Sequence, residues 1–296
     1  MRTTSILPIF GLTIFWLLLS GFELSPSLIP ADQILSGGPP KDGIPALTNP
    51  NMETAEAADL WLEKHDLILG IVIQDKARAY PVRIMNWHEI VNDHIGGKSF
   101  VISYCPLCGS GMAFDTGDRF GVSGMLYQSD VLLYDKKSES LWSQLMMQAV
   151  AGPRTGEKLQ LLPIEHSTWQ TWKTRHPNTD VLSRHTGFRR DYSRNPYAGY
   201  ESVAGTYFPV YHHDERLPAK TWVIGLSMGN HHLAWKLDDL KKSGSHQLTW
   251  QQHRLAITVH GEGIQIRDVE SKKILPVTRL YWFAWVAFHP DTELAK

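Results

Sequence analysis

Short apolar runs separated by turn residues dominate the hydrophobic pattern of this chain. Valine, isoleucine, leucine and aromatic residues fill each run, and glycine, proline, aspartate or serine bounds it, which is typical of β-strands. The pattern predicts strands at residues 67–74, 98–104, 130–135, 221–227, 255–260 and 263–269. Helical periodicity is rare and predicts short helices near Ala55–Lys64, Asn86–Asp93 and Ser167–Arg175. We therefore predict an α+β fold that is rich in strands and contains a few short helices.

Two pairs of segments resemble copies of each other. The pattern W-x-x-W-x-x-x-H-P occurs at residues 169–177 and again at 282–290. Upstream of each, a glycine stands nine residues before an alanine that is followed by an aromatic residue, at Gly70 and Gly225. Because both pairs occur in the same order, we predict an internally duplicated β scaffold with repeats at about 66–182 and 221–294.

The first repeat is about 40 residues longer than the second, measured between the matched glycine and histidine. Features present in both copies are best explained by the scaffold, including His176 and His289, which each precede a proline and end a predicted helix. Features found only in the first copy are the better candidates for function.

The N-terminus predicts export. No charged residue lies between Arg2 and Glu23, and residues 6–22 are dominated by large apolar side chains. We expect residues 1–22 to be a membrane anchor or a signal segment, with the body on the periplasmic or extracytoplasmic side. Residues 23–51 are rich in proline and glycine and are predicted to be a spacer. Residues 52–296 would then form the folded domain.

Charge and cysteine content narrow the function classes. The chain has 29 Lys and Arg against 30 Asp and Glu, a formal net charge of −1. It therefore lacks the basic excess that binding to a phosphate backbone requires, and we expect no nucleic-acid partner. The only two cysteines form one local C-x-x-C, at Cys105 and Cys108, so they cannot be the disulfide framework of a small secreted domain.

The C-x-x-C pattern favours a metal-binding turn. A redox pair of the thioredoxin type opens a helix, but glycines punctuate the segment after Cys108. The sequence C-P-L-C-G between two predicted strands is instead similar to a zinc-ribbon turn, which directs both sulfurs at one metal. No second C-x-x-C exists, so other residues must complete the site. We predict His88 as the third ligand, and Met112 could add a thioether if the metal is copper.

If Cys105, Cys108 and His88 bind one metal ion, the distances between their ligand atoms can be predicted. Zinc bonds of about 2.3 Å to sulfur and 2.0–2.1 Å to imidazole imply sulfur-to-nitrogen separations of roughly 3–5 Å. A further group should hold the free ring nitrogen of His88, and Glu89, Asp93 and Gln144 are the candidates.

Five motifs lie at residues 37–47, 78–81, 88–93, 104–109 and 141–144. On these motifs the chain resembles the DUF3179 family, a bacterial and archaeal group of unknown function, from approximately Leu35 to the C-terminus. The resemblance implies an exported or anchored protein and identifies His88, Cys105 and Cys108 as family hallmarks, without implying a reaction.

The leading hypothesis is a membrane-anchored extracytoplasmic protein with a copper or zinc site on Cys105, Cys108 and His88. Such a site would support redox or hydrolytic chemistry or the handling of the metal. One alternative is a thiol–disulfide oxidoreductase that uses the cysteine pair alone. Another is a non-catalytic ligand-binding module in which a Cys105–Cys108 disulfide is a structural staple.

Overall fold

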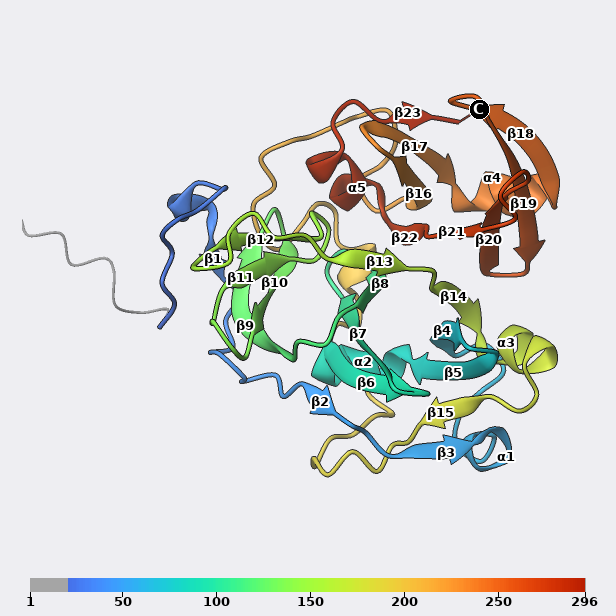
Figure 1. The fold of residues 1–296 in the computed structure, drawn as a ribbon, viewed down its shortest axis with the longest axis horizontal. Coiled ribbons are helices and arrows are strands. Elements are labelled where there is room, and N and C mark those ends of the chain that lie inside the picture. Colours follow the sequence, from blue (N-terminus) through green and yellow to red (C-terminus); the bar gives the residue numbers. More distant parts are fainter. Residues whose placement is uncertain (1–20, 296) are drawn as a thin grey trace, which may run out of the picture.

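Strands dominate the computed structural model, which describes residues 21–295 (Figure 1). It contains 41% strand and 14% helix, and its five small sheets are arranged as a five-bladed β-propeller. The predicted α+β class is therefore wrong. Among residues 21–295 each α-helix is only four or seven residues long, so none there forms a layer of its own.

Three sheets come mainly from the first half of the chain. The first contains, in spatial order, β1 (Leu35–Ser36), β9 (Phe120–Tyr127), β10 (Asp130–Asp135), β11 (Leu141–Ser143) and β12 (Gln148–Ala151). The second contains β13 (Gln160–Leu162), β8 (Ser110–Asp115), β7 (Lys98–Cys105), β6 (Ile90–Ile95) and β2 (Leu47–Thr48). The third contains β14 (Glu165–Thr168), β4 (Leu67–Ile73), β5 (Lys76–Pro81), β15 (Asp180–Leu182) and β3 (Met52–Thr54).

The second half of the chain builds two further sheets. One contains β22 (Thr278–Tyr281), β16 (Trp222–Met228), β17 (His231–Lys236) and β23 (Glu293–Leu294). The other contains β18 (His246–Trp250), β19 (His253–His260), β20 (Gly263–Asp268) and β21 (Ile274–Leu275). The α-helices are α1 (Ala55–Ala58), α2 (Val82–His88), α3 (Trp169–Arg175), α4 (Leu237–Ser243) and α5 (Trp282–Phe288), with short 3-10 turns at η1 (Ala31–Gln33) and η2 (Tyr200–Ser202).

The two halves build the same strand orders. The order β13-β8-β7-β6 in the first half corresponds to β21-β20-β19-β18 in the second, and β14-β4-β5-β15 corresponds to β22-β16-β17-β23. The segment β9–β12 lies between β8 and β13 and has no counterpart between β20 and β21. Duplication as the origin of this match, with boundaries 66–182 and 221–294, stays a prediction.

Each W-x-x-W motif packs a helix onto the strand that carries the matched glycine. A Cβ atom on Gly70 would lie 2.4 Å from the Trp172 ring, and one on Gly225 would lie 2.3 Å from the Trp285 ring. Only glycine allows an indole to approach the strand so closely. Each indole N–H then donates to a threonine seven residues further along the chain.

The predicted helix at Asn86–Asp93 is not one element in the structure. The helix α2 ends at His88, and β6 begins at Ile90. Between them Glu89 has a φ of 56°, in the left-handed region, which interrupts the helix and turns the chain into the sheet. Hydrophobic periodicity did not reveal this break, because the residues on both sides of it are buried.

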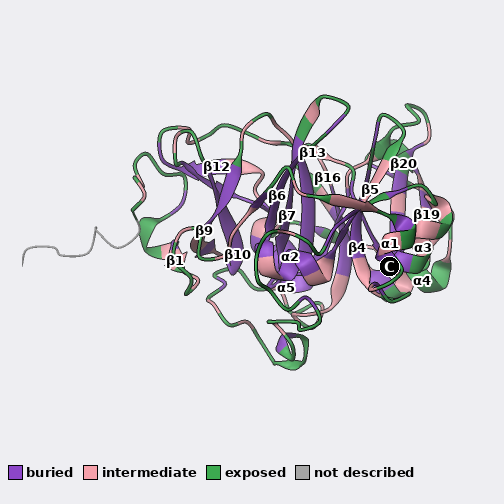
Figure 2. Cartoon of the chain, turned by 90° about the horizontal axis from the view of Figure 1, so that it is seen from below, coloured by how far each residue is buried: buried purple, intermediate pink, exposed green. Residues whose placement is uncertain are grey.

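Most strands are buried, whereas the loops and the outer faces of α1, α3 and α4 are more exposed (Figure 2). Part of the predicted spacer 23–51 belongs to the sheets, because Leu35 pairs with Leu126 and Leu47 pairs with Val91. The predicted anchor or signal segment lies outside the described residues except for Gly21 and Phe22. Within residues 21–295 no helix is long and apolar enough to cross a membrane.

Substitution of Gly70 by alanine should destabilise the fold, because the new methyl group overlaps the Trp172 ring. We expect a loss of about 1–3 kcal/mol in the free energy of unfolding, the usual cost of overpacking. Urea denaturation measures it. Gly117→Ala is the matched control, since nothing lies within 4 Å of a Cβ at that position. Equal stability of Gly70→Ala and Gly117→Ala would contradict the close packing.

Candidate metal centre

The two cysteines lie in the tight turn between β7 and β8. Cys105 is the last residue of β7, and Ser110, its partner in the ladder, is the first of β8. A strand follows Cys108, not a helix, so the turn lacks the helix N-terminus that lowers a thiol pKa in redox pairs. Both cysteines are free and buried.

A third group approaches both sulfurs from another sheet. A carboxylate oxygen of Asp130 and the Sγ atoms of Cys105 and Cys108 all lie within 4.8 Å of one another. Asp130 begins β10 directly after a two-residue turn, Gln128–Ser129, whose φ angles are 55° and 62°. The carbonyl oxygen of Ser129 accepts a hydrogen bond from Cys108, with a distance of 3.5 Å between sulfur and oxygen. This buried group can hold a metal ion.

The environment of Asp130 is unusual for a carboxylate. The side chain is fully buried, and burial raises its pKa to about 7. Its Oδ2 atom accepts the Leu145 N–H at 3.1 Å, and the Val131 N–H and the two thiols lie close enough to favour its charged form. Its Oδ1 atom has no hydrogen-bond partner of good geometry. No ion pair within the described part of the chain includes this residue. An unpartnered carboxylate oxygen in the core is costly, so the arrangement favours a cation beside it.

Burial also raises the pKa of both thiols, Cys105 and Cys108. Thiols in this environment are protonated near neutral pH and are poor nucleophiles. A metal ion would reverse this preference, because it binds the thiolate and displaces the proton.

Gln144 holds the cysteine turn in place. Its Nε2 atom donates to the Ser103 hydroxyl at 2.9 Å, and its Oε1 atom accepts from the Ser110 hydroxyl at 2.5 Å. Ser103 and Ser110 stand on the two strands that carry the turn, and all three side chains are fully buried. Gln144 is one of the three residues that the sequence offers as a partner for the imidazole of His88, and in the structure it instead contacts Ser103 and Ser110.

The second half of the chain closes the other side of the turn. The Tyr281 N–H donates to the carbonyl oxygen of Cys108 at 2.9 Å. Gly109 has a φ of 65°, and a Cβ at this position would lie 2.3 Å from the Trp222 ring. The cysteine turn is therefore held by both halves of the molecule.

A cavity of about 300 Å³ opens beside Cys105, lined mainly by apolar side chains. The titratable residues that line it are Cys105, Glu89, Tyr197 and Tyr207. The Tyr197 hydroxyl donates to the Glu89 carboxylate at 3.0 Å, and burial raises the pKa of Glu89 to about 7. A carboxyl group that exchanges its proton near neutral pH thus shares one wall with a thiol.

The structure places Asp130, not His88, beside the two sulfurs. The His88 Nδ1 atom lies 2.7 Å from the carbonyl oxygen of Pro45 and must donate to it. The Nε2 atom then accepts from the Tyr192 hydroxyl, also at 2.7 Å. Both ring nitrogens therefore have protein partners, and burial lowers the pKa of the ring.

The remaining predicted residues have other roles in the structure. Asp93 accepts hydrogen bonds from Arg78 and Tyr80, both at 2.7 Å, and so belongs to a buried ion-pair network. Met112 is buried in the hydrophobic cluster that also contains the two cysteines. Neither side chain is a partner of His88.

The sequence interpretation missed Asp130 and Tyr197 as site residues. Asp130 follows the cysteine turn by 22 positions, at the start of an ordinary apolar strand, and no local pattern separates it from a turn-forming aspartate. Tyr197 lies in a loop without strand or helix. Both enter the site through tertiary packing alone.

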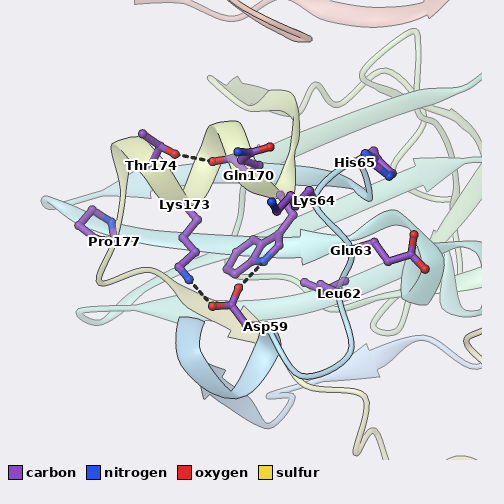
Figure 3. Close-up of a pocket in the computed structure, with 10 residues that line it drawn as sticks. Asp59, Leu62, Glu63, Lys64, His65, Gln170, Lys173, Thr174 and Pro177 are labelled. Carbon is purple, nitrogen blue, oxygen red and sulfur yellow. Dashed lines mark hydrogen bonds and ion pairs between the residues drawn. The ribbon is translucent and has the colours of Figure 1, made fainter.

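A larger cavity of about 710 Å³ lies against α3, as shown in Figure 3. One ion pair lies in it: Asp59 accepts a hydrogen bond from Lys173 and another from the indole N–H of Trp169. It brings together no group of metal-ligating side chains, so it is the weaker candidate site.

The fold and the site define a strand-rich protein with a buried dithiol–carboxylate group beside an apolar cavity. The chain belongs to the DUF3179 family: the family model, described as a protein of unknown function, matches residues 41–274. The match confirms the family resemblance found from the sequence motifs. No curated protein and no solved structure matches the chain.

Proposed function

We propose that this protein binds a transition-metal ion through Cys105, Cys108 and Asp130. The observation that carries the proposal is the buried carboxylate of Asp130, which lies beside two thiols and leaves one oxygen without a partner. Three groups that become anionic when they lose their protons converge there, and no Lys or Arg forms an ion pair with Asp130 in the described chain. A cation would satisfy all three.

The donor set favours zinc. Copper(I) prefers sulfur ligands alone, whereas zinc is borderline soft and accepts thiolate and carboxylate together. Met112 packs in the core, and we assign it no ligand role. Three protein ligands also leave one position open, which is the arrangement of catalytic zinc sites and not of closed structural ones.

The cavity beside Cys105 would admit a small ligand to the open coordination position of the metal. When bound, zinc supplies a Lewis acid that polarises an oxygen of a small ligand. The apolar walls of the cavity would keep out bulk water but admit the one water molecule that hydrolysis consumes. Glu89 would take a proton from that water as it attacks and return it to the leaving group near neutral pH. The Tyr197 hydroxyl would orient the Glu89 carboxylate. We therefore favour metal-dependent hydrolytic chemistry on a small, largely apolar substrate.

One observation favours a second candidate, thiol–disulfide exchange. Cys105 lines the cavity, and Asp130 lies close enough to both thiols to take a proton from one of them. The raised thiol pKa values and the absence of a helix after Cys108 weigh against it. Metal content distinguishes the two candidates.

Zinc binding should depend on the three proposed ligands. We expect Cys105→Ser, Cys108→Ser and Asp130→Asn each to lower zinc affinity by more than the roughly 10–100-fold that loss of an outer-shell partner costs. The measurement is competition with a chromophoric chelator, together with elemental analysis of the purified full-length protein.

Met112→Leu is the matched control, because it alters a buried side chain on β8 without removing a proposed ligand, and it should keep its zinc. If the three ligand variants retained as much zinc as the wild type, the proposed site would be refuted. A wild-type protein that binds no zinc, but whose cysteines cycle between dithiol and disulfide, would favour thiol–disulfide exchange.

We also propose that the domain lies outside the cytoplasm and is attached to the cell membrane through residues 1–22. The support is the uncharged apolar run 6–22, which follows Arg2. An exported domain would encounter zinc without the competing thiols of the cytoplasm.

A reporter enzyme that is active only after export should be active when fused after Lys296. The same fusion with residues 2–22 deleted is the control and should be inactive, because the apolar segment would drive export. Activity measured in intact cells decides the matter. A fusion that is inactive with residues 2–22 present would count against this location.

A further inference from the structure

The last turn of α2 fastens an irregular loop, residues 183–195. The indole N–H of Trp87 donates to the carbonyl oxygen of Arg194 at 3.1 Å. The next residue, His88, accepts from the Tyr192 hydroxyl at 2.7 Å. Two consecutive helix residues thus hold the second part of a loop that contains no helix or strand.

The first part of the loop is held equally firmly. Ser183 donates its N–H to the carbonyl oxygen of Asn51 at 3.0 Å and its hydroxyl to Glu53 at 2.7 Å. The Asn51 side chain in turn donates to the carbonyl oxygen of His185 at 3.1 Å. The loop is therefore fixed at both ends, so the side chains that it presents are preorganised.

The fixed loop presents positive charge. Arg184, Arg189 and Arg190 are exposed, and none of them forms an ion pair with a carboxylate in the described chain. Arg184 lies over the Trp61 ring and Arg190 over the Trp87 ring, which holds two guanidinium groups by cation–π contact.

These two arginines line a pocket of about 370 Å³, which we call the arginine pocket. Its wall consists of Trp61, Arg83, Arg184, His185, Arg190, Asp191, Tyr192 and Ser193. Arg83 forms an ion pair with Asp66 at 2.7 Å. Asp191 accepts two hydrogen bonds from Ser193 and keeps its negative charge, which offsets one of the two remaining cations. Arg184 and Arg190 therefore remain available to an entering anion.

We propose that the arginine pocket binds the phosphate group of a phosphate ester, and that His88 is its positioning residue. Planar guanidinium groups match the oxygens of phosphate better than any other side chain does. The volume exceeds that needed by a lone oxyanion and falls in the range of small-molecule sites. A soluble phosphate ester and the headgroup of an anionic lipid carry the same group.

The role of His88 follows from its contacts. Its ring receives the Tyr192 hydroxyl, and Tyr192 forms part of the pocket wall. The same hydroxyl contacts the Thr186 hydroxyl at 2.6 Å, so one hydrogen-bonded chain joins the buried histidine to both parts of the loop. His88 would thus act through Tyr192 and would not touch the ligand.

Titration calorimetry with inorganic phosphate tests the pocket in the full-length protein. Removal of both free guanidinium groups, in R184Q/R190Q, should weaken phosphate binding at least tenfold, because the charge-assisted hydrogen bonds from both groups to the phosphate oxygens are lost. The control R254Q/K242Q removes two positive charges from exposed residues of the second half and should bind phosphate like the wild type.

Vesicles distinguish the two sources of the phosphate group. Sedimentation with phosphatidylcholine vesicles, with and without phosphatidylglycerol, separates headgroup binding from insertion of residues 6–22. Phosphate binding without any preference for phosphatidylglycerol indicates a soluble ester. If the wild type also prefers vesicles that contain phosphatidylglycerol, and R184Q/R190Q loses this preference while the control R254Q/K242Q keeps it, the ligand is a lipid headgroup. The proposal would be overturned if the protein bound neither phosphate nor phosphatidylglycerol vesicles preferentially. It would also be overturned if R184Q/R190Q and R254Q/K242Q lost binding to the same extent.

The positioning role has its own test. Tyr192→Phe and His88→Leu should both weaken phosphate binding, and His88→Gln, which retains a hydrogen-bonding amide, should restore part of it. The zinc content of all three should equal that of the wild type. Unchanged phosphate binding in Tyr192→Phe would refute the positioning role, and loss of zinc in His88→Leu would instead return His88 to the metal site.

Discussion

The burial of the Asp130 carboxylate beside two thiols is the constraint on which the site depends. The core around it is apolar, one of its oxygens has no partner, and its pKa is raised to about 7. Such a group destabilises a fold unless something compensates for its desolvation. Both halves of the chain enclose it: β10 carries Asp130, while β22 holds the cysteine turn through the Tyr281 N–H. A metal ion would convert this unfavourable arrangement into a stabilising one.

The cysteine turn could be predicted from the sequence because its determinants are local, namely two cysteines, a proline and glycines between two strand-like runs. Its third partner could not. His88 was chosen because a short helix, a glycine turn and one strand could bring the chain from it back to the cysteine turn. Its hydrogen-bond partners instead lie 43 residues before it and 104 residues after it. Asp130 is brought to the sulfurs by contact between the start of β10 and the β7–β8 turn, which belong to different sheets, and local patterns do not encode that contact.

The fold was predictable to a similar extent. Alternating and continuous apolar runs located the main strands, but the α+β class failed because the few helices are too short to form a layer. A single left-handed residue, Glu89, divided one predicted helix into α2 and β6. The matched positions occupy equivalent settings in the two halves, since Trp172 and Trp285 lie against Gly70 and Gly225 in the same way. The order of the sheets required the structure.

X-ray absorption at the zinc edge tests the central claim most directly, namely that Asp130 and not His88 completes the metal site. The full-length protein loaded with one equivalent of zinc should show two sulfur scatterers at about 2.3 Å and oxygen scatterers at about 2.0–2.2 Å. It should lack the outer-shell scattering of an imidazole ring, and Asp130→Asn should alter the oxygen shell. An imidazole signal that disappears in His88→Leu would contradict the account.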